Sequence, residues 1–366
     1  MSLRRFFCVT VLALLAGAPR PAAADLAAAL GDTLAAWHAA NPSAPGLLVH
    51  VVCPPAGLDS TFVLGTADRG GTEPLTAAHT FRIASNTKTY LAAAVLRLVE
   101  EGRLGLDDPL GRHLEPVRAA LLTGDGYDLD RITIAQVLSH TGGLFEHPAD
   151  PRYEEAILAD PRRVWTADEQ VRLCVEWGDP VAAPGDTFSY SDTGYVLLGG
   201  IVEQLTGKTL GPAVRGLLDL RRLGLDATWW EIMEAAPAGA GPRIHQHFGE
   251  HDATGWHPSL DLFGGGGLVS DARDLAWFMR RLMQGEVLHE PASLARMTGR
   301  GTPSYRLGLI RAELGGYPAW GHSGFWNTFA FHVPDLDLTV AGCIPDHFAG
   351  RGQMLAGQLA AAVAGR

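Results

Sequence analysis

The chain has 366 residues and a formal net charge of −11, with 40 acidic residues against 29 basic ones. Such acidity disfavours nucleic acid and anionic membrane surfaces as partners. The length allows a large hydrophobic core, built as one two-lobed domain or as two domains.

The first 24 residues have the pattern of a secretory signal peptide. Arg4 and Arg5 precede an apolar run over 6–16, and three alanines end at Ala24. A charged start, a short apolar run and small residues at the end are typical of such signals. We therefore predict cleavage after Ala24 and export to a periplasm or the medium. The remaining unit, 25–366, holds no later apolar run long enough to span a bilayer.

Three cysteines follow the signal, Cys53, Cys174 and Cys343. An odd number excludes a fully paired framework, and a core of this size does not need one. The sequence leaves two alternatives open, one disulfide or three buried thiols.

Strands are predicted at both ends of the chain. The N-terminal pair covers 46–53 and 60–67, and strand-like pieces separated by Gly, Pro, Asn or Asp follow residue 303. Between them, from about 81 to 300, the helical period dominates. We predict an α/β (α+β) fold: one antiparallel sheet built from both chain ends and flanked by helices, joined to a mostly helical lobe. A cleft between the two parts is the expected place for a site.

Three helices of the middle segment matter for function. The first follows Ser85, and the third begins near Thr193. The second is short and lies within 132–144, where Thr133 and Gln136 have the spacing of a capping box. The first and the third lie next to polar residues of a type used in catalysis.

Lys88 is one of only two lysines in the chain, and it follows Ser85 by three residues. Residues at i and i+3 share one face of a helix, so the amine and the hydroxyl can meet. Arginine cannot lose its proton in a protein, whereas a partly buried lysine can, and a neutral amine can activate a serine. A serine that merely caps the helix is the alternative interpretation.

Two further polar stretches lie downstream. Tyr190-Ser191-Asp192 precedes the third helix, and its alternative interpretation is an aromatic core residue followed by a helix cap. His322-Ser323-Gly324 lies in a strand-like piece, where a glycine can serve the close approach of another backbone or of a substrate.

In this order, Ser-x-x-Lys, Tyr-x-Asp and His-Ser-Gly closely resemble the motifs of the serine β-lactamase and penicillin-binding protein superfamily. The neighbouring stretches FRIASNTKTYLAAAVLRLVEEGRLGLDDPL and ITIAQVLSHTGGL match as well. The resemblance is to the class C-like branch, with its class C β-lactamases, D-alanyl-D-alanine carboxypeptidases, D-aminopeptidases and esterases, and it covers most of 45–345. It implies a β-lactamase/transpeptidase-like fold and a serine hydrolase that uses no metal and no organic cofactor.

The resemblance implies catalytic roles for Ser85, Lys88 and Tyr190. Ser85 is expected to be the nucleophile, with Lys88 in its hydrogen-bond network and Tyr190 relaying a proton to the leaving group. Whether Lys88 or Tyr190 is the acylation base stays open. A neighbouring ammonium is expected to lower the pKa of the phenol.

The resemblance also implies a substrate-binding stretch at His322, Ser323, Gly324 and Phe325. The backbone N–H groups of Ser85 and Phe325 are expected to form an oxyanion hole. His322 is expected to orient a substrate carboxylate or the Tyr190 hydroxyl.

Asp192 departs from the pattern, because the commoner residue at this position is asparagine. An ionised carboxylate only accepts hydrogen bonds, whereas an amide also donates. We therefore expect Asp192 to hold Lys88 as an ammonium and to disfavour efficient β-lactam hydrolysis.

The function predicted from these residues is D-alanyl-D-alanine carboxypeptidase-like activity on D-amino-acid peptides. An esterase and a class C-like β-lactamase share all the motifs, so a small peptide, a β-lactam or an ester is the expected partner. A catalytically silent penicillin-binding-like sensor module is the alternative from another class, and the intact Ser85, Lys88 and Tyr190 argue against it.

Other conspicuous residues receive structural interpretations. The four glycines of 264–267 lack the preceding strand of a nucleotide site, and relatives use a similar segment structurally. Clustered polar residues do not fit the usual hydrolytic zinc signatures; they are His245, His247, His251, Asp252 and His257. At most two of four aromatic residues are expected to touch substrate, namely Trp229, Trp230, Tyr305 and Trp326.

Overall fold

The computed structural model describes residues 23–365. All but the last two residues of the predicted signal lie outside this range, so its cleavage is not visible in the fold. No helix within 23–365 is long and apolar enough to cross a membrane. The helices are α1 (Ala23–Ala40), α2 (Thr87–Glu100), α3 (Pro116–Gly124), α4 (Ile134–Leu138), α5 (Pro151–Ala159), α6 (Ala167–Trp177), α7 (Asp192–Thr206), α8 (Leu210–Leu218), α9 (Ala272–Met283), α10 (Pro291–Gly299) and α11 (Gly352–Ala364).

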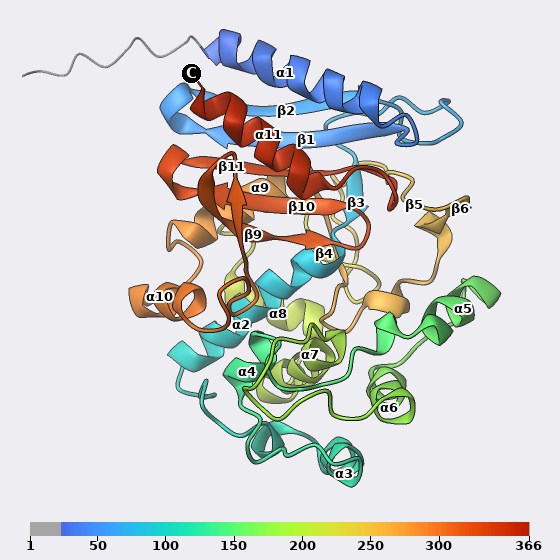
Figure 1. Cartoon of the computed structure of the whole chain (residues 1–366), viewed down its shortest axis with the longest axis vertical. Helices are drawn as coiled ribbons and strands as arrows, with labels where there is room; N and C mark the ends of the chain where they lie inside the picture. Colours follow the sequence, from blue (N-terminus) through green and yellow to red (C-terminus); the bar gives the residue numbers. More distant parts are fainter. Residues whose placement is uncertain (1–22, 366) are drawn as a thin grey trace, which may run out of the picture.

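Strands from both ends of the chain form one six-stranded antiparallel sheet in the order β2-β1-β11-β10-β9-β8 (Figure 1). Its members are β1 (Gly46–Cys53), β2 (Leu58–Gly65), β8 (Ile310–Leu314), β9 (Tyr317–Gly324), β10 (Thr328–Val333) and β11 (Leu338–Cys343). The N-terminal hairpin joins the C-terminal strands through β1 and β11, where Leu48 lies opposite Cys343. The predicted fold class is confirmed.

Both faces of the sheet are covered by helices. α1 and α11 pack on one face, and α9 packs on the other (Figure 1). Alternate residues of β1 enter the two cores: Leu47 and Val49 pack with α1 and α11, and Leu48 packs with α9. Because neither face meets water, β1 is apolar on both faces except at His50 and does not show a polar–apolar alternation.

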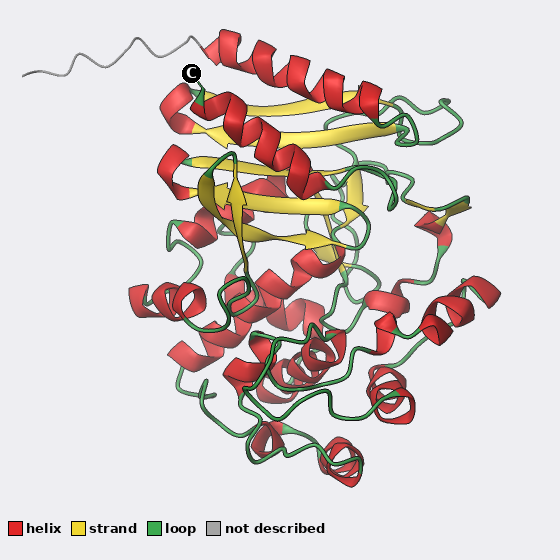
Figure 2. Cartoon of the chain, in the orientation of Figure 1, coloured by secondary structure: helices red, strands yellow, loops and turns green. Residues whose placement is uncertain are grey.

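The remaining helices form the second part of the molecule, below the sheet in Figure 2. α2 runs through this part and is buried from Thr87 to Leu98. It packs against α7 and α8. A helix buried on all sides needs no polar face, which explains the apolar and alanine-rich run after Lys88.

The middle segment also contains short strands that the helical period did not predict. β3 (Thr80–Arg82), β7 (Leu268–Asp271) and β4 (Trp229–Trp230) form a three-stranded sheet. β5 (His247–Phe248) and β6 (His251–Asp252) form a hairpin. Strands of two to four residues are too short to show a period of two, so the pattern missed them.

Element boundaries differ from the prediction where a turn intervenes. The second strand starts two residues early because Gly57 turns with a φ of +67°, and it ends at Gly65, where φ is +74°. The capping box of Thr133 and Gln136 is confirmed at α4, but that helix ends at Leu138. All three cysteines after the predicted signal are buried, with Cys174 and Cys343 as free thiols.

Candidate active site

Ser85 lies in a 3₁₀ turn, Ala84–Asn86, between β3 and α2. Ala84 has a φ of +45°, a conformation that residues with a Cβ rarely adopt. The turn lies against β9, where a Cβ on Gly324 would come within 2.4 Å of the Ile83 carbonyl oxygen. A glycine at 324 therefore allows the strand edge to approach the serine, which is one of the roles predicted for it.

The Lys88 ammonium donates two hydrogen bonds and forms one ion pair. Nζ lies 2.9 Å from Ser85 Oγ, 2.6 Å from the Gly265 carbonyl oxygen and 2.5 Å from Asp192 Oδ1. The side chain is wholly buried. Because an ammonium can only donate, Ser85 Oγ accepts from it and keeps its own hydrogen for another partner.

Lys88 is held in its charged form. Burial by itself would lower the pKa of the ammonium, but the negative charge of Asp192 raises it above its ordinary value, with smaller contributions from Tyr190 and Asp261. This agrees with the expectation that Asp192 holds Lys88 as an ammonium. A lysine in this state stabilises negative charge on Ser85 Oγ rather than removing the serine proton.

Tyr190 lies beside Ser85 and Lys88, just before α7. The Lys88 Nζ is 5.0 Å from the centre of its ring, and its hydroxyl is within hydrogen-bonding reach of Lys88 and Ser85. Burial raises the pKa of the phenol above its usual value and outweighs the opposing effect of Lys88. Lys88 lowers this pKa as expected, but the net pKa is raised, because loss of hydration costs the phenolate more than the ammonium returns.

Asp192 is the first residue of α7, where the helix dipole favours a negative charge. The preceding Ser191 caps the helix by accepting a hydrogen bond from the Gly194 N–H. The Asp192 N–H donates to Oε2 of Glu146, a second carboxyl in the same cleft. Burial, and next the charge of Asp192, raises the pKa of Glu146 well above its usual range.

A third carboxyl, Asp261, completes an acidic cluster around Lys88. Burial and the neighbouring Asp192 raise the pKa of Asp261 to about 7, although Lys88 and Arg82 oppose the shift. The single ammonium of Lys88 therefore lies among three acidic side chains, and Asp192 is the one that forms the ion pair with it. Two of them, Glu146 and Asp261, were not predicted from the sequence.

The four glycines of 264–267 fill the space behind these charges. A Cβ on Gly265 would lie 3.1 Å from Cγ of Asp192, and one on Gly266 would lie 2.1 Å from Oδ2 of Asp261. A Cβ on Gly267 would lie 2.3 Å from Trp230 Nε1. No side chain fits at 266 or 267, and the close packing of the run lets the Gly265 carbonyl oxygen reach Lys88. The structural interpretation of the run agrees with this packing.

His322 is placed differently from its expected role. Nδ1 donates to the Ser323 carbonyl oxygen at 2.6 Å, and Nε2 accepts from the Tyr305 hydroxyl at 2.9 Å. Burial, followed by the charge of Lys88, lowers the pKa of the imidazole to about 3. A neutral ring with both nitrogens in use cannot bind a substrate carboxylate. The hydroxyl that His322 contacts is that of Tyr305, whereas a contact with the Tyr190 hydroxyl was expected.

An apolar pocket of about 110 Å³ opens beside Ser85. Most of its wall is aromatic or aliphatic, and these residues are Tyr153, Ile157, Phe248, Trp256, Leu260, Phe325 and Trp326. Asp192, Glu154 and Asp261 bring carboxylates to the same pocket. The pocket offers an acyl group a mainly apolar surface with a few polar groups, the usual composition of a small-molecule site.

The aromatic wall is tied to the strand that leads to Ser85. Arg82 donates from Nη2 to the Trp256 carbonyl oxygen at 2.7 Å and from Nη1 to the Ala253 carbonyl oxygen at 3.1 Å. Its Nε lies 2.7 Å from a carboxylate oxygen of Glu231. A single buried guanidinium therefore joins β3 to the pocket wall, a planar geometry that lysine would not reproduce.

A wider pocket of about 780 Å³ lies on the other side of Ser85. Tyr190, Ser323 and Phe325 line it, together with the exposed Arg351 at the start of α11. The predicted stretch from His322 to Phe325 therefore borders the serine on this side. Phe325 lines both pockets, as expected for a residue next to the attacked carbonyl.

The histidine-rich stretch and most of the aromatic residues given structural interpretations make no contact with Ser85, Lys88 or Tyr190. His245 binds Asp252 at 2.6 Å, and within residues 23–365 no three metal-ligating side chains are arranged to hold an ion. Of the four aromatic residues considered, Trp326 lines the apolar pocket, whereas Trp229 and Trp230 are buried in other contacts.

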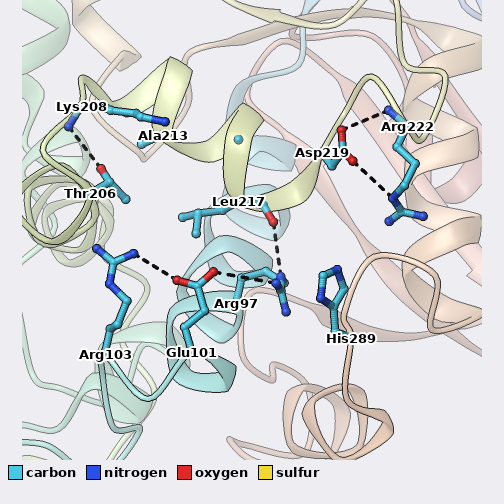
Figure 3. Close-up of a pocket in the computed structure, with 11 residues that line it drawn as sticks. Arg97, Glu101, Arg103, Thr206, Lys208, Ala213, Leu217, Asp219, Arg222 and His289 are labelled. Carbon is cyan, nitrogen blue, oxygen red and sulfur yellow. Dashed lines mark hydrogen bonds and ion pairs between the residues drawn. The ribbon is translucent and has the colours of Figure 1, made fainter.

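A separate hollow of about 650 Å³ lies on the helical part, between α2 and α8 (Figure 3). It contains several cations, but Arg103 is 3.0 Å from Glu101 and Arg222 is 3.5 Å from Asp219. Lys208, the other lysine of the chain, is exposed at its edge. The hollow holds none of the predicted catalytic residues, so the chemistry belongs to the cleft at Ser85.

The residues missed by sequence reasoning carried weak local signals. Asp261 stands just before the glycine run, and Glu146 follows Gly143, so both lie beside stretches that the sequence had marked. A carboxylate next to glycines that permit close approach is a usable clue. Arg351 carried no such clue, because only the fold brings the last helix to the serine.

Comparison with known proteins places these residues in context. The family model described as Beta-lactamase matches residues 24–344. A D-stereospecific amidohydrolase from Streptomyces sp. is 30% identical, with a TM-score of 0.75 over 90% of this chain and 96% of the other. A D-amino acid amidase from Ochrobactrum anthropi SV3 is 24% identical, with a TM-score of 0.76 over 93% and 98%, a likeness that shows the fold alone.

Two curated relatives match shorter stretches. Esterase EstB from Burkholderia gladioli is 36% identical over 160 residues, which are 42% of this chain and 39% of the esterase. A putative D-alanyl-D-alanine carboxypeptidase from Salmonella paratyphi A is 26% identical over 257 residues, 63% of this chain and 58% of the relative. The chain thus spans less than two thirds of the length of either relative.

Proposed function

The chain belongs to the beta-lactamase family and is a serine hydrolase, and from this premise we propose that it cleaves amide bonds of D-amino acids with apolar side chains. The observation that carries the proposal is the apolar pocket beside Ser85. An engineered apolar cavity of about 150 Å³ holds benzene. The pocket of about 110 Å³ therefore suits a side chain of several carbons and is large for the methyl group of alanine.

The catalytic contacts support an acyl-serine route in which Tyr190 relays protons. Ser85 Oγ attacks the substrate carbonyl carbon while its proton passes to the Tyr190 oxygen. The Tyr190 proton passes to the leaving nitrogen as the C–N bond breaks, so the phenol carries no lasting charge. The raised pKa of Tyr190 supports such a relay, and the Lys88 ammonium stabilises the transient negative charge.

Chirality and leaving group are inferred from different sources. The D-configuration comes from the name of the Streptomyces amidohydrolase, which resembles this chain over almost its whole length. On the leaving-group side, Arg351 is the arginine of the wider pocket, so we propose that it favours a leaving group with a carboxylate, as in a dipeptide. The D-alanyl-D-alanine substrate predicted from the sequence is one member of this class.

Ester hydrolysis is the second candidate, and Asp192 is the observation that favours it. Its carboxylate forms an ion pair with Lys88 at 2.5 Å and offers no donor to a substrate amide. An ester makes weaker demands on such a donor and has a better leaving group. The match to EstB over 160 residues supports this candidate as well.

A substrate panel separates these functions. It comprises D- and L-phenylalanine p-nitroanilide, a D-alanyl-D-alanine peptide, p-nitrophenyl butyrate and a chromogenic cephalosporin. We expect the D-phenylalanine compound to exceed its L-isomer and the D-alanine peptide in kcat/KM. Turnover of the ester alone would replace the proposal with an esterase, and rapid turnover of the cephalosporin would replace it with a β-lactamase.

A matched pair of variants tests the pocket itself. Leu260→Phe adds a ring to the pocket wall, whereas Val117→Phe adds the same ring at an exposed position on α3. We expect the first to lower kcat/KM for D-phenylalanine amides at least about tenfold, because overpacking excludes the side chain. Equal effects of both variants would contradict the assignment of the pocket.

We also propose that the chain is exported. Arg4, Arg5 and the apolar run that follows support this, and cleavage after Ala24 would spare Leu26, the first buried residue of α1. N-terminal sequencing of the protein from the culture medium or periplasm should begin at Asp25. An unprocessed chain confined to the cytosol would contradict export.

A further inference from the structure

His140 lies in a conformation that few residues adopt. It follows α4 by two positions, has a φ of +56° and is 2% exposed. Residues with a Cβ at positive φ are uncommon and persist where the surrounding structure determines them. The backbone conformation of His140 is held by its contacts with the segment that carries Tyr190.

Three contacts join His140 to that segment. The Ser189 N–H donates to the His140 carbonyl oxygen at 2.8 Å, and the Ser191 N–H donates to His140 Nδ1 at 3.0 Å. The imidazole also lies against the Tyr190 ring, with 4.2 Å between ring centres and 32° between planes. The residues on either side of Tyr190 and the ring itself are thus all held by one histidine.

We infer that His140 is a positioning residue for Tyr190, holding the phenol hydroxyl within reach of Ser85 and Lys88. The inference rests on the proposed acyl-serine function, because it assigns His140 no contact with substrate. Displacing a reacting group by about 1 Å can cost about a hundredfold in rate. Among the described residues, His140 alone accepts hydrogen bonds from the backbone N–H groups of both Ser189 and Ser191, the two neighbours of Tyr190.

The bonds require one tautomer of His140. Since Nδ1 accepts from Ser191, the ring hydrogen is on Nε2, which has no partner among residues 23–365. Tyr195 and Tyr305 surround the ring, with centres 5.1 and 4.6 Å away. Burial, then Lys88 and His322, keeps the pKa of His140 well below its usual value, so the acceptor stays available.

Two substitutions at this position separate the contacts. Asparagine tolerates positive φ, and its Oδ1 lies near the place of Nδ1, so His140→Asn keeps the bond to Ser191 and loses the ring. Glycine also tolerates positive φ, so His140→Gly loses both the bond and the ring without adding backbone strain. Neither variant disturbs the bond between Ser189 and the backbone carbonyl of residue 140.

The experiment measures p-nitrophenyl butyrate hydrolysis and the rate at which a fluorophosphonate probe labels Ser85. We expect His140→Gly to lower kcat and the labelling rate at least about tenfold, with KM within about threefold. His140→Asn should recover most of the loss. His332→Asn is the control, because His332 is a buried imidazole whose Nδ1 is 2.8 Å from Thr339 Oγ1, away from the cleft.

The possible outcomes decide between the inference and the proposed function. A glycine variant as fast as the wild type, or an asparagine variant no better than glycine, would overturn the positioning role. If the wild type neither turns over the ester nor labels, the acyl-serine function fails. Crystal structures of the two variants then decide the inference, which requires Tyr190 to be displaced with glycine and retained with asparagine.

Discussion

The six-stranded sheet and the catalytic cleft bury similar polar groups but pair them differently. In the sheet, His50 is bonded at both ring nitrogens, to Thr61 and to Asp59, each at 2.8 Å. His332 is bonded to Thr339 on the neighbouring strand. These pairs form between adjacent strands, so every partner is supplied by the register of the sheet.

In the cleft the groups are not matched in this way. Glu146, Asp192 and Asp261 surround the single ammonium of Lys88, and the pKa values of Glu146 and Asp261 are raised. Buried ionisable groups that lack a full set of partners cost stability, and proteins retain them where function requires them. In the sheet, the buried histidines have hydrogen-bond partners on neighbouring strands and serve stability. In the cleft, ionisable groups without full sets of partners serve the chemistry.

The largest expected effect tests whether the cleft serves catalysis rather than stability. Ser85→Ala should lower kcat/KM by about three orders of magnitude or more for any substrate the wild type turns over, since it removes the nucleophile. It should leave the midpoint of thermal unfolding nearly unchanged, because Ser85 contributes little to the core. Steady-state kinetics and thermal denaturation check both parts. Residual turnover near the wild-type rate would exclude Ser85 as the nucleophile.

The next effect concerns stability and belongs to the sheet. Burial, followed by the charge of Arg280, lowers the pKa of His332 to about 4, whereas an unfolded histidine titrates near pH 6.5. The folded state therefore binds fewer protons between these values. The stabilising effect of the neutral ring is complete above about pH 6.5 and is lost as the pH falls through about 4.

His332→Asn should remove this pH dependence while keeping an acceptor for Thr339. Between pH 6.5 and 4, we expect the variant to lose about 2–3 kcal/mol less free energy of unfolding than the wild type. Urea denaturation at the two pH values measures the difference. Equal losses in the two proteins would show that other groups dominate the acid response.

The smallest effect changes one charge of the cleft. Asp192→Asn should raise the rate at which a fluorescent penicillin acylates Ser85 by about three- to tenfold, because the amide can donate to the substrate as well as accept from Lys88. Asp59→Asn makes the same change in the sheet and should leave labelling unaltered. An unchanged labelling rate in Asp192→Asn would mean that the carboxylate is not what disfavours β-lactams.

Part of the cleft could be predicted because it depends on spacing within one helix. Ser85 and Lys88 meet at 2.9 Å as their i, i+3 spacing predicts, although the serine lies in a 3₁₀ turn before α2. The capping box at Thr133 is equally local. The roles of Tyr190 and of the other predicted site residues stay predictions until activity is measured.

The sequence by itself determined the serine–lysine pair, the strands at both chain ends and the apolar character of β1, because these depend on neighbours in the chain. Only the tertiary structure decided the raised pKa of Tyr190, the neutral state of His322 and the contacts of His140 with the segment around Tyr190. Gly265 and Asp192 reach Lys88 from positions more than a hundred residues away. Proton affinities in the cleft follow from burial and from such distant charges, and no local pattern contains either.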